Sequence, residues 1–391
     1  MRLRPLSGFL LLLAFLSLGV PPAAAQSPPI SAQGAVLCPP VAPLDRPLNC
    51  APLGAAAYVD QWGAQGVTFP LTPPPAIPIA PDWLSPPPDS LPYYAYVQAD
   101  KARMYRRTSD GLDTERPAKT YPPGLVYVSY DWVTYSGHQR IYRVAPEANL
   151  WMQGKDLLPV TPSAFRGVQL TAPPPRPFGW SVANRVQPRK APGLGQETWP
   201  YLLKRYTLVQ VYDQREADEL TWYMIGPNLW VEQRWVGLVF PREEPPEGVT
   251  TSRWIEINLF EQTLAAYEGN RLVFATLVST GSPPFWTRPG LFAIYEKHAT
   301  TDMRGSFMSD RSDYYMLEDV PWTMYFDEAR ALHGAYWHDV FGYPTSHGCV
   351  NLTIADAHWL FEWAQLGDQV YVWDPSGKTP TDPSLYGSGG F

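Results

Sequence analysis

Residues 331–352, with the sequence ALHGAYWHDVFGYPTSHGCVNL, limit the possible fold of this chain more than any other segment. They contain Cys349, the last of three cysteines, with His347 two residues before it and His333 sixteen residues before it. Sixteen residues are too many for one face of a helix, but a strand–loop–strand can fold back and bring the thiol and the imidazole into contact. The segment therefore predicts two strands joined by a loop, with Cys349 and His333 side by side.

The chemistry that this pair would serve is nucleophilic. A thiolate attacks an acyl carbon, while an imidazole takes the thiol proton and later returns a proton to the leaving group. Gly348 has no Cβ and lets the nearby backbone amides approach an oxyanion. Two other interpretations are open: a small buried cysteine beside unrelated histidines, or a zinc site built from Cys349, His347, His333 and His338. The spacing of those four residues resembles no common zinc motif.

The string Ser-His-Gly-Cys-Val-Asn at 346–351, with His-Gly at 333–334, closely resembles the active-site signature of the L,D-transpeptidases of the YkuD family, which cross-link peptidoglycan. The resemblance spans residues 253–375. It includes the opening strands, a Thr-x-x-Gly-x-Phe turn, the strand that leads to the histidine, and a helix and a strand after the cysteine. These lie at residues 254–280, 287–292, 321–326, 355–357 and 367–370.

The resemblance implies a role for each residue of the candidate site. Cys349 is expected to be the nucleophile and His333 its general base and acid, with the carbonyl of Gly334 orienting the imidazole in place of a carboxylate. His347 would support the thiolate. Contacts to the oxyanion or the substrate would come from Gly348, Ser346, Asn351 and Tyr325. No metal and no organic cofactor is implied.

The implied reaction begins when Cys349 attacks the carbonyl of the L-to-D peptide bond before the terminal D-Ala of a tetrapeptide stem. D-Ala leaves, and an amine resolves the thioester to form a cross-link or to attach another polymer. Water as the acceptor would instead make the protein an L,D-carboxypeptidase. An alternative of another class is a non-catalytic scaffold that binds the cell wall.

The N-terminus indicates export. Residues 1–25 read as a signal peptide, with Arg2 and Arg4 before an apolar run at 9–20 and three alanines at 23–25. The apolar run is shorter than the roughly 20 residues of a spanning helix, although an uncleaved anchor is an open alternative. We therefore expect the protein in the cell envelope, in the periplasm or the cell wall.

Residues 26–92 are rich in proline and alanine and predict a stiff leader, in which Tyr58, Trp62 and Trp83 are candidates for docking onto a neighbouring domain. Cys38 and Cys50 lie in this leader. In an exported protein they can form a disulfide or stay reduced, and pairing them would leave Cys349 unpaired.

Residues 93–165 and 175–240 repeat each other. Both contain Asn-Leu-Trp, at 149–151 and 228–230, with similar apolar runs before and after it. Their short alternating runs predict small antiparallel barrels that weakly resemble bacterial SH3-like (SH3b) modules. Such modules could bind wall glycans or act as plain spacers. The candidate aromatic residues for sugar stacking are Trp132, Tyr135, Trp222 and Trp235, although core packing would explain most of them equally well.

The remaining segments complete the predicted organisation. Residues 241–247 are a polar linker, and residues 250–375 are the catalytic domain, with strands at 254–259, 263–267, 271–279 and 290–295. Residues 297–320 lack a clear period and are expected to form a lid loop. Thr353 would cap a short helix, and residues 376–391 would be a disordered tail.

Composition agrees with this organisation. With 16 Trp and 23 Tyr, and with 17% charged residues, the chain suits β-structure rather than disorder. The net charge of −7 argues against nucleic acid as a partner. The expected fold is therefore mainly β, with two SH3-like barrels followed by a β-sandwich catalytic domain that has a short helix after the nucleophile.

Overall fold

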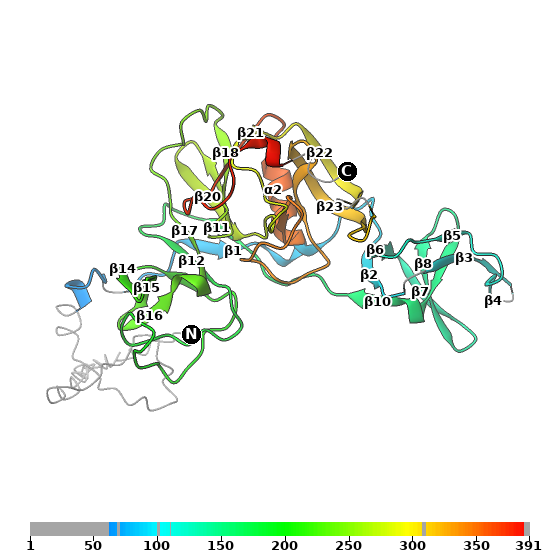
Figure 1. Ribbon diagram of the computed structural model, residues 1–391, viewed down its shortest axis with the longest axis horizontal. Helices are drawn as coiled ribbons and strands as arrows, with labels where there is room; N and C mark the ends of the chain where they lie inside the picture. The colour runs from blue at the N-terminus through cyan, green and yellow to red at the C-terminus, as the bar shows by residue number, and fades with distance from the viewer. Residues whose placement is uncertain (1–61, 69–70, 100–101, 110, 307–309, 387–391) are drawn as a thin grey trace, which may run out of the picture.

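The computed structural model describes residues 62–68, 71–99, 102–109, 111–306 and 310–386. The predicted signal peptide, Tyr58, Cys38 and Cys50 lie outside the described residues. The fold is mainly β, as expected. Figure 1 shows a central body that holds the C-terminal strands and one helix, with a smaller group of strands at each end of the molecule. Within the described part of the chain, no helix is both long and apolar enough to cross a membrane.

One seven-stranded sheet forms the first layer of the central body. Its order is β1 (Ala76–Pro78), β11 (Val168–Leu170), β20 (Arg271–Leu277), β19 (Thr263–Glu268), β18 (Arg253–Asn258), β26 (Gln369–Trp373) and β21 (Gly290–Ala293). The predicted strand at 254–259 and the hairpin that follows it are confirmed as β18, β19 and β20. Both faces of β18 are covered, because Ile255 and Ile257 enter one hydrophobic cluster and Trp254 enters another.

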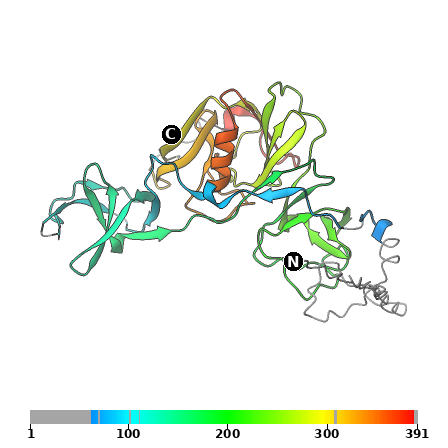
Figure 2. The ribbon, with the colours of Figure 1, turned by 180° about the vertical axis from the view of Figure 1, so that it is seen from behind.

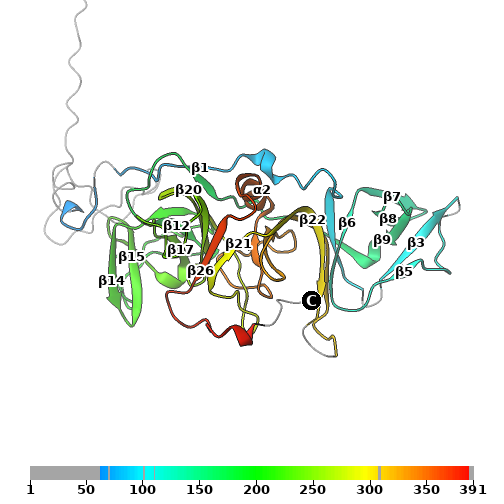
Figure 3. The same ribbon diagram turned by 90° about the horizontal axis from the view of Figure 1, so that it is seen from above.

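A second seven-stranded sheet forms the other layer. Its main path is β10 (Leu157–Val160), β2 (Tyr93–Val97), β6 (Leu125–Tyr130), β23 (Tyr315–Asp327), β24 (Arg330–Gly334) and β25 (Val350–Leu352), and β22 (Glu296–Gly305) also pairs with β23. Strands from the first repeat thus continue the sheet of the predicted catalytic domain. Figure 3 shows β6 and β22 lying close together where these two parts of the chain meet.

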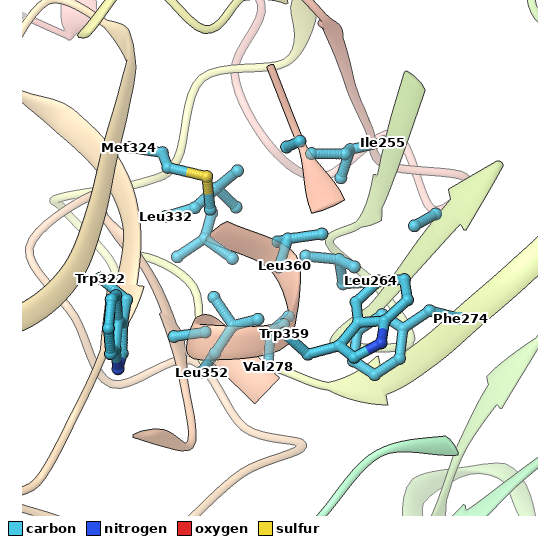
Figure 4. Close-up of a cluster of buried hydrophobic side chains, with 14 of the residues drawn as sticks. Ile255, Leu264, Phe274, Val278, Trp322, Met324, Leu332, Leu352, Trp359 and Leu360 are labelled. Carbon is cyan, nitrogen blue, oxygen red and sulfur yellow. The ribbon is translucent and has the colours of Figure 1, made fainter. Parts of the chain in front are cut away.

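The helix α2 (Ile354–Trp363) lies against the second sheet and completes the core. It begins where predicted, because Thr353 Oγ1 accepts a hydrogen bond from the Asp356 N–H over 3.2 Å. Figure 4 shows Trp359 beside Phe274 of the first sheet, with Leu360 turned toward Ile255 and Leu264. The helix therefore joins the two layers directly behind the strand that follows Cys349.

The predicted lid is not a structureless loop. Residues 297–320 belong mostly to the long hairpin of β22 and β23, which pair antiparallel from Glu296 and Tyr325 to Gly305 and Tyr315. The expectation of a loop was wrong because β22 is largely polar on both faces, which hides the alternation that marks a half-buried strand. On the side that faces β23, its backbone groups are satisfied by strand pairing.

The described part of the proline-rich leader packs against the rest of the chain. Trp62 is fully buried in a cluster with Trp222, Met224 and Trp230. Further on, β1 pairs with β11, and Trp83 in the short 3-10 helix η1 (Pro81–Leu84) contacts the ring of His358. Figure 2 shows this segment running along the back of the central body. Two of the three predicted docking aromatics therefore do contact other parts of the chain.

The two repeats share the same local structure around Asn-Leu-Trp. Asn149 and Asn228 both have a left-handed backbone, with φ of 51° and 52°, and each precedes a strand, a 3-10 turn and a second strand. The elements are β9 (Leu150–Gln153), η2 (Gly154–Asp156) and β10 in the first repeat, and β16 (Leu229–Glu232), η3 (Gln233–Trp235) and β17 (Val236–Val239) in the second.

The repeats differ in how their other strands associate. In the first, β3 (Arg103–Thr108), β4 (Gly111–Leu112), β5 (Lys119–Thr120), β7 (Trp132–Ser136), β8 (Gln139–Ala145) and β9 form a six-stranded sheet. In the second, β12 (Phe178–Ser181), β13 (Leu208–Gln210) and β17 form one three-stranded sheet, while β14 (Asp213–Ala217), β15 (Leu220–Gly226) and β16 form another. The SH3-like barrels and the domain boundaries stay predictions.

The chain beyond the last strand is tied to the central body. It contains the 3-10 helix η4 (Pro383–Leu385), and the carbonyl of Tyr386 accepts a hydrogen bond of 2.5 Å from Arg330 Nη2. This contact differs from the disordered tail expected at 376–391, of which residues 387–391 lie outside the described part. Because Arg330 is almost fully buried, its guanidinium needs such acceptors.

Candidate active site

A cavity of about 290 Å³ lies where β24 and β25 meet the β22–β23 hairpin. Its polar lining includes His333, His338, Ser346, His347, Cys349 and Asn351. Its apolar lining includes Leu125, Met303, Leu317 and Trp337. A largely apolar pocket with a few polar groups on one wall is typical of a site that binds and orients a small substrate.

The pairing of β24 with β25 brings the histidine and the cysteine to the same wall. The two strands are parallel, and His333 lies opposite Asn351. Cys349 lies in the bend directly before β25, two residues from Asn351, and both residues line the cavity. His333 lines the same cavity as Cys349. The predicted strand–loop–strand arrangement is present.

The thiol and the imidazole do not hydrogen-bond each other in this structure, although direct contact was expected. Cys349 Sγ instead donates to the carbonyl of Ala329 over 3.8 Å. The Nδ1 atom of His333 lies 3.3 Å from the carbonyl oxygen of Gly334. If Nδ1 carries the proton, Nε2 is free to accept one, which is the tautomer that a general base needs.

Burial keeps both groups neutral. It lowers the pKa of His333 to about 4 and raises the pKa of the Cys349 thiol above its ordinary value. A backbone hydrogen bond from Ala331 and the positive charge of Arg330 act against the rise of the thiol pKa without cancelling it. Burial therefore favours a thiol beside a neutral imidazole over a thiolate–imidazolium ion pair.

The turn before Cys349 requires a glycine. Gly348 has φ of +120°, and a Cβ atom there would lie 3.2 Å from Arg330 Nε. Its carbonyl accepts a hydrogen bond of 2.9 Å from Thr287 Oγ1, the first residue of the Thr-x-x-Gly-x-Phe motif. That hydroxyl in turn accepts the Gly281 N–H over 2.9 Å. The motif therefore fixes the loop that carries the nucleophile.

Ser346 closes the same turn from the other side. Its hydroxyl accepts the Gly348 N–H over 3.1 Å and donates to the Cys349 carbonyl over 2.6 Å. The Gly348 N–H is therefore already bonded, and it can donate to an oxyanion only if its bond to Ser346 breaks. Of the two amides expected to form the oxyanion hole, the Cys349 N–H is the one for which we find no acceptor among the described residues.

The remaining predicted residues surround the thiol. The ring of His347 stacks on Tyr315 at 5.6 Å and lies 4.9 Å from the ring of Phe285, and burial lowers its pKa. Tyr325 packs in the same apolar cluster as Cys349. His347 and Tyr325 therefore lie near the thiol, as the sequence predicts. Support of the thiolate by His347 and contact of Tyr325 with the substrate stay predictions.

Three residues that contribute to the site were not predicted to do so. His338 contacts Asn351, with 3.0 Å between His338 Nε2 and Asn351 Nδ2. Arg330 lies beneath the nucleophile loop and pairs with Asp327 over 3.1 Å. Leu125, from β6, reaches the cavity from the first repeat. The histidine was visible in the sequence as a possible metal ligand, but nothing there pointed to the other two.

The described residues contain no group of three or more His, Cys, Asp or Glu side chains placed to hold a metal ion. His338 instead uses its ring nitrogens within the protein, and His298 bonds to Glu296 over 2.8 Å. His358 stacks on Trp322 at 3.8 Å behind the sheet, in keeping with the packing of α2.

Comparisons with known proteins find one family model and several similar solved structures. Residues 252–372 match the family model of YkuD, described as the L,D-transpeptidase catalytic domain. Similar solved structures include L,D-transpeptidases from Stackebrandtia nassauensis, with 27% identity over 37% of this chain and 62% of that chain and a TM-score of 0.27, and from Xylanimonas cellulosilytica, with 27% identity over 33% and 64% and a TM-score of 0.27.

The catalytic domain of an L,D-transpeptidase from E. faecium is 24% identical over 32% of this chain and all of that chain, with a TM-score of 0.29. No curated protein matches. This chain spans less than two thirds of the Stackebrandtia and Xylanimonas structures. The matched segment holds the whole cysteine and histidine signature. Residues 252–372 are a YkuD-family L,D-transpeptidase catalytic domain.

Proposed function

We propose that this protein is an exported peptidoglycan L,D-transpeptidase that works through a thioester on Cys349. The observation that carries the proposal is the placement of Cys349 and His333 on one wall of a single cavity, within the segment that matches the L,D-transpeptidase catalytic domain. The predicted signal peptide supports export to the cell envelope.

In the first step, His333 Nε2 takes the Cys349 proton as Sγ attacks the carbonyl carbon before the terminal D-Ala of a tetrapeptide stem. Because both groups are neutral at rest, this transfer takes place as substrate excludes water from the cavity. The tetrahedral oxyanion would be held by the Cys349 N–H. The carbon–nitrogen bond then breaks, His333 gives its proton to the departing nitrogen, and D-Ala leaves.

In the second step, an acceptor amine attacks the thioester. His333 removes a proton from this amine, the carbon–sulfur bond breaks, and the proton returns to Cys349. The product is a new amide, either a cross-link between stems or an attachment to another amine-bearing polymer. If water attacks instead, the product is a free carboxylate and the protein acts as an L,D-carboxypeptidase.

Binding of wall glycans by the repeats is a separate part of the proposal. Trp132 and Tyr135 are 57% and 58% exposed on the first repeat, and Trp235 is 41% exposed on the second, so their rings could stack on sugars. Trp222 is not available for stacking, since it is 2% exposed and lies in the same buried cluster as Trp62, in line with the alternative of core packing. Loss of pelleting with insoluble wall material in a Trp132→Ala variant would support glycan binding, and unchanged pelleting would count against this residue.

The reaction is tested by incubating the purified protein with sacculi that contain tetrapeptide stems and then analysing the released stem peptides by mass spectrometry. Transpeptidation predicts dimers in which the carbonyl freed by the loss of D-Ala is joined to an amine of a second stem, with one D-Ala released for each dimer. Carboxypeptidase activity predicts tripeptides without dimers. If neither product forms with the wild-type protein but the protein pellets with the sacculi, the chain is a wall-binding scaffold.

A further inference from the structure

The Asn351 side chain has an unmet hydrogen bond beside the nucleophile. It is 2% exposed, and one end of its amide lies at His338 while the other end, Oδ1, has no partner among the described residues. A buried polar group without a partner costs free energy, so such a group in a cavity wall points to a ligand that supplies the missing bond. The kind of ligand depends on which end of the amide faces His338.

The tautomer of His338 settles the orientation of this amide. His338 Nδ1 accepts the Val340 N–H over 3.2 Å, so in the neutral imidazole the proton is on Nε2. Burial lowers the pKa of His338 to about 4, which keeps the ring neutral near pH 7. An Nε2–H group cannot bond to the N–H groups of Asn351 Nδ2, which lies 3.0 Å away. A half-turn of the amide about its Cβ–Cγ bond places Oδ1 at His338, where it accepts the Nε2–H group.

With that orientation, the unmet end of the amide is Nδ2, which is a donor. Asn351 and Cys349 line the same cavity. Asn351 also lies opposite His333 in the β24–β25 pair. The cavity wall therefore offers N–H groups next to the thiol and the imidazole, and these require an oxygen acceptor.

We propose that His338 is a positioning residue: it holds Asn351 Oδ1, so that Asn351 Nδ2 donates to a carbonyl or carboxylate oxygen of the bound stem peptide. This inference rests on the proposed function for the identity of the substrate. His338 itself does not touch the reacting atoms in this arrangement. If His338 were replaced by a side chain without an N–H group, the Asn351 amide would be free to turn Oδ1 toward the substrate.

The kinetic test compares His338→Ala, His338→Gln and Asn351→Ala with the wild type, using a soluble tetrapeptide stem and an amine acceptor. His138, exposed at the turn between β7 and β8, supplies the matched control His138→Ala. We expect kcat/KM to fall about 10- to 100-fold in His338→Ala. His338→Gln should restore most of the loss, because a glutamine amide can place an N–H near the position of Nε2. A merely structural histidine would not be rescued in this way.

A stem peptide with a C-terminal amide identifies the acceptor. If the penalty of His338→Ala disappears with this substrate, the acceptor is the terminal carboxylate. If the penalty is unchanged, the acceptor is a peptide carbonyl. Equal kcat/KM for His338→Ala and the wild type with both substrates would overturn the proposal.

A measurement without substrate separates this inference from the proposed function. Nitrogen-15 NMR of labelled histidine should show His338 protonated at Nε2 and bare at Nδ1, with a shift of the Asn351 amide signals in His338→Gln. Protonation at Nδ1 would overturn the proposal even if the enzyme is active. If the wild type releases no D-Ala while His338 is protonated at Nε2, the proposed function fails and the orientation of the amide stands.

Discussion

Leu125 and Tyr315 are paired residues of two parallel strands, β6 and β23, that lie far apart in the sequence. The pairing joins the first repeat to the catalytic sheet, and hydrogen bonds reinforce it: Tyr121 Oη donates to Glu318 Oε1 over 2.6 Å, and Ser129 Oγ donates to Asp319 Oδ2 over 2.5 Å. Both Leu125 and Tyr315 line the cavity that contains Cys349. The first repeat is therefore a part of the site wall and not only a spacer.

Enlarging Leu125 should interfere with substrate binding. Leu125 is 42% exposed, so Leu125→Trp should fold normally while its larger side chain takes up room in a cavity of about 290 Å³. We expect kcat/KM to fall on the order of 10-fold, mostly through KM. Leu158→Trp is the matched control, because Leu158 is also exposed but does not line the cavity. Equal losses in the two variants would show that Leu125 has no special place in the site.

Removal of the predicted general base should abolish most activity without unfolding the protein. We expect His333→Ala to lower kcat by about 10²- to 10⁴-fold, the usual contribution of a positioned base. His138→Ala is the control, since His138 is exposed at the turn between β7 and β8, in the first repeat. Steady-state kinetics with circular dichroism of both variants checks the result. Turnover by a folded His333→Ala variant close to that of the wild type would refute the role of His333.

The reactivity of Cys349 should rise with pH through a value above the ordinary pKa of a cysteine. Burial raises the thiol pKa, and His333, with a pKa of about 4, carries no charge near pH 7 that would stabilise a thiolate. Alkylation rates measured across pH, with the modified residue mapped by mass spectrometry, test this. A rate that already levels off below pH 7 would instead reveal a thiolate–imidazolium pair.

Stability should depend on pH through Glu318, which links the first repeat to the catalytic sheet. Burial raises its pKa to about 7 from 4.5, so the folded state binds a proton more tightly than the unfolded state. The resulting stability is fully present below pH 4.5 and is lost as pH rises through about 7, by roughly 3 kcal/mol. Glu318→Gln should lose less stability than the wild type between pH 4.5 and 8 in urea denaturation. Parallel curves for the two proteins would contradict the raised pKa.

The sequence predicts the parts of the fold that depend on local patterns. The alternation at 254–259, the turn at 268–270 and the Thr353 cap each correspond to an element of the structure, because side-chain periodicity and capping act over a few residues. The β22–β23 hairpin was missed for the opposite reason. Its first strand, β22, is largely polar on both faces, and its pairing with β23 is not visible in the local sequence pattern.

In the candidate site, too, the residues given by the local sequence were predicted, and those given by long-range contacts were not. The signature around Cys349 predicts which residues share the cavity, since its spacing fits two adjacent strands. The contribution of Leu125 was not predictable, because it depends on the pairing of β6 with β23 across the sequence. The contact of His338 with Asn351 was hidden as well, since a histidine in a loop gives no sign of which buried amide it will meet.

The most direct test of the account is intact-mass and peptide-level mass spectrometry of the protein after brief incubation with a tetrapeptide stem and no acceptor amine. The account predicts one covalent adduct equal to the stem minus D-Ala, located on Cys349 and absent from Cys349→Ala. An adduct on another residue, or release of D-Ala by the Cys349→Ala variant, would contradict it.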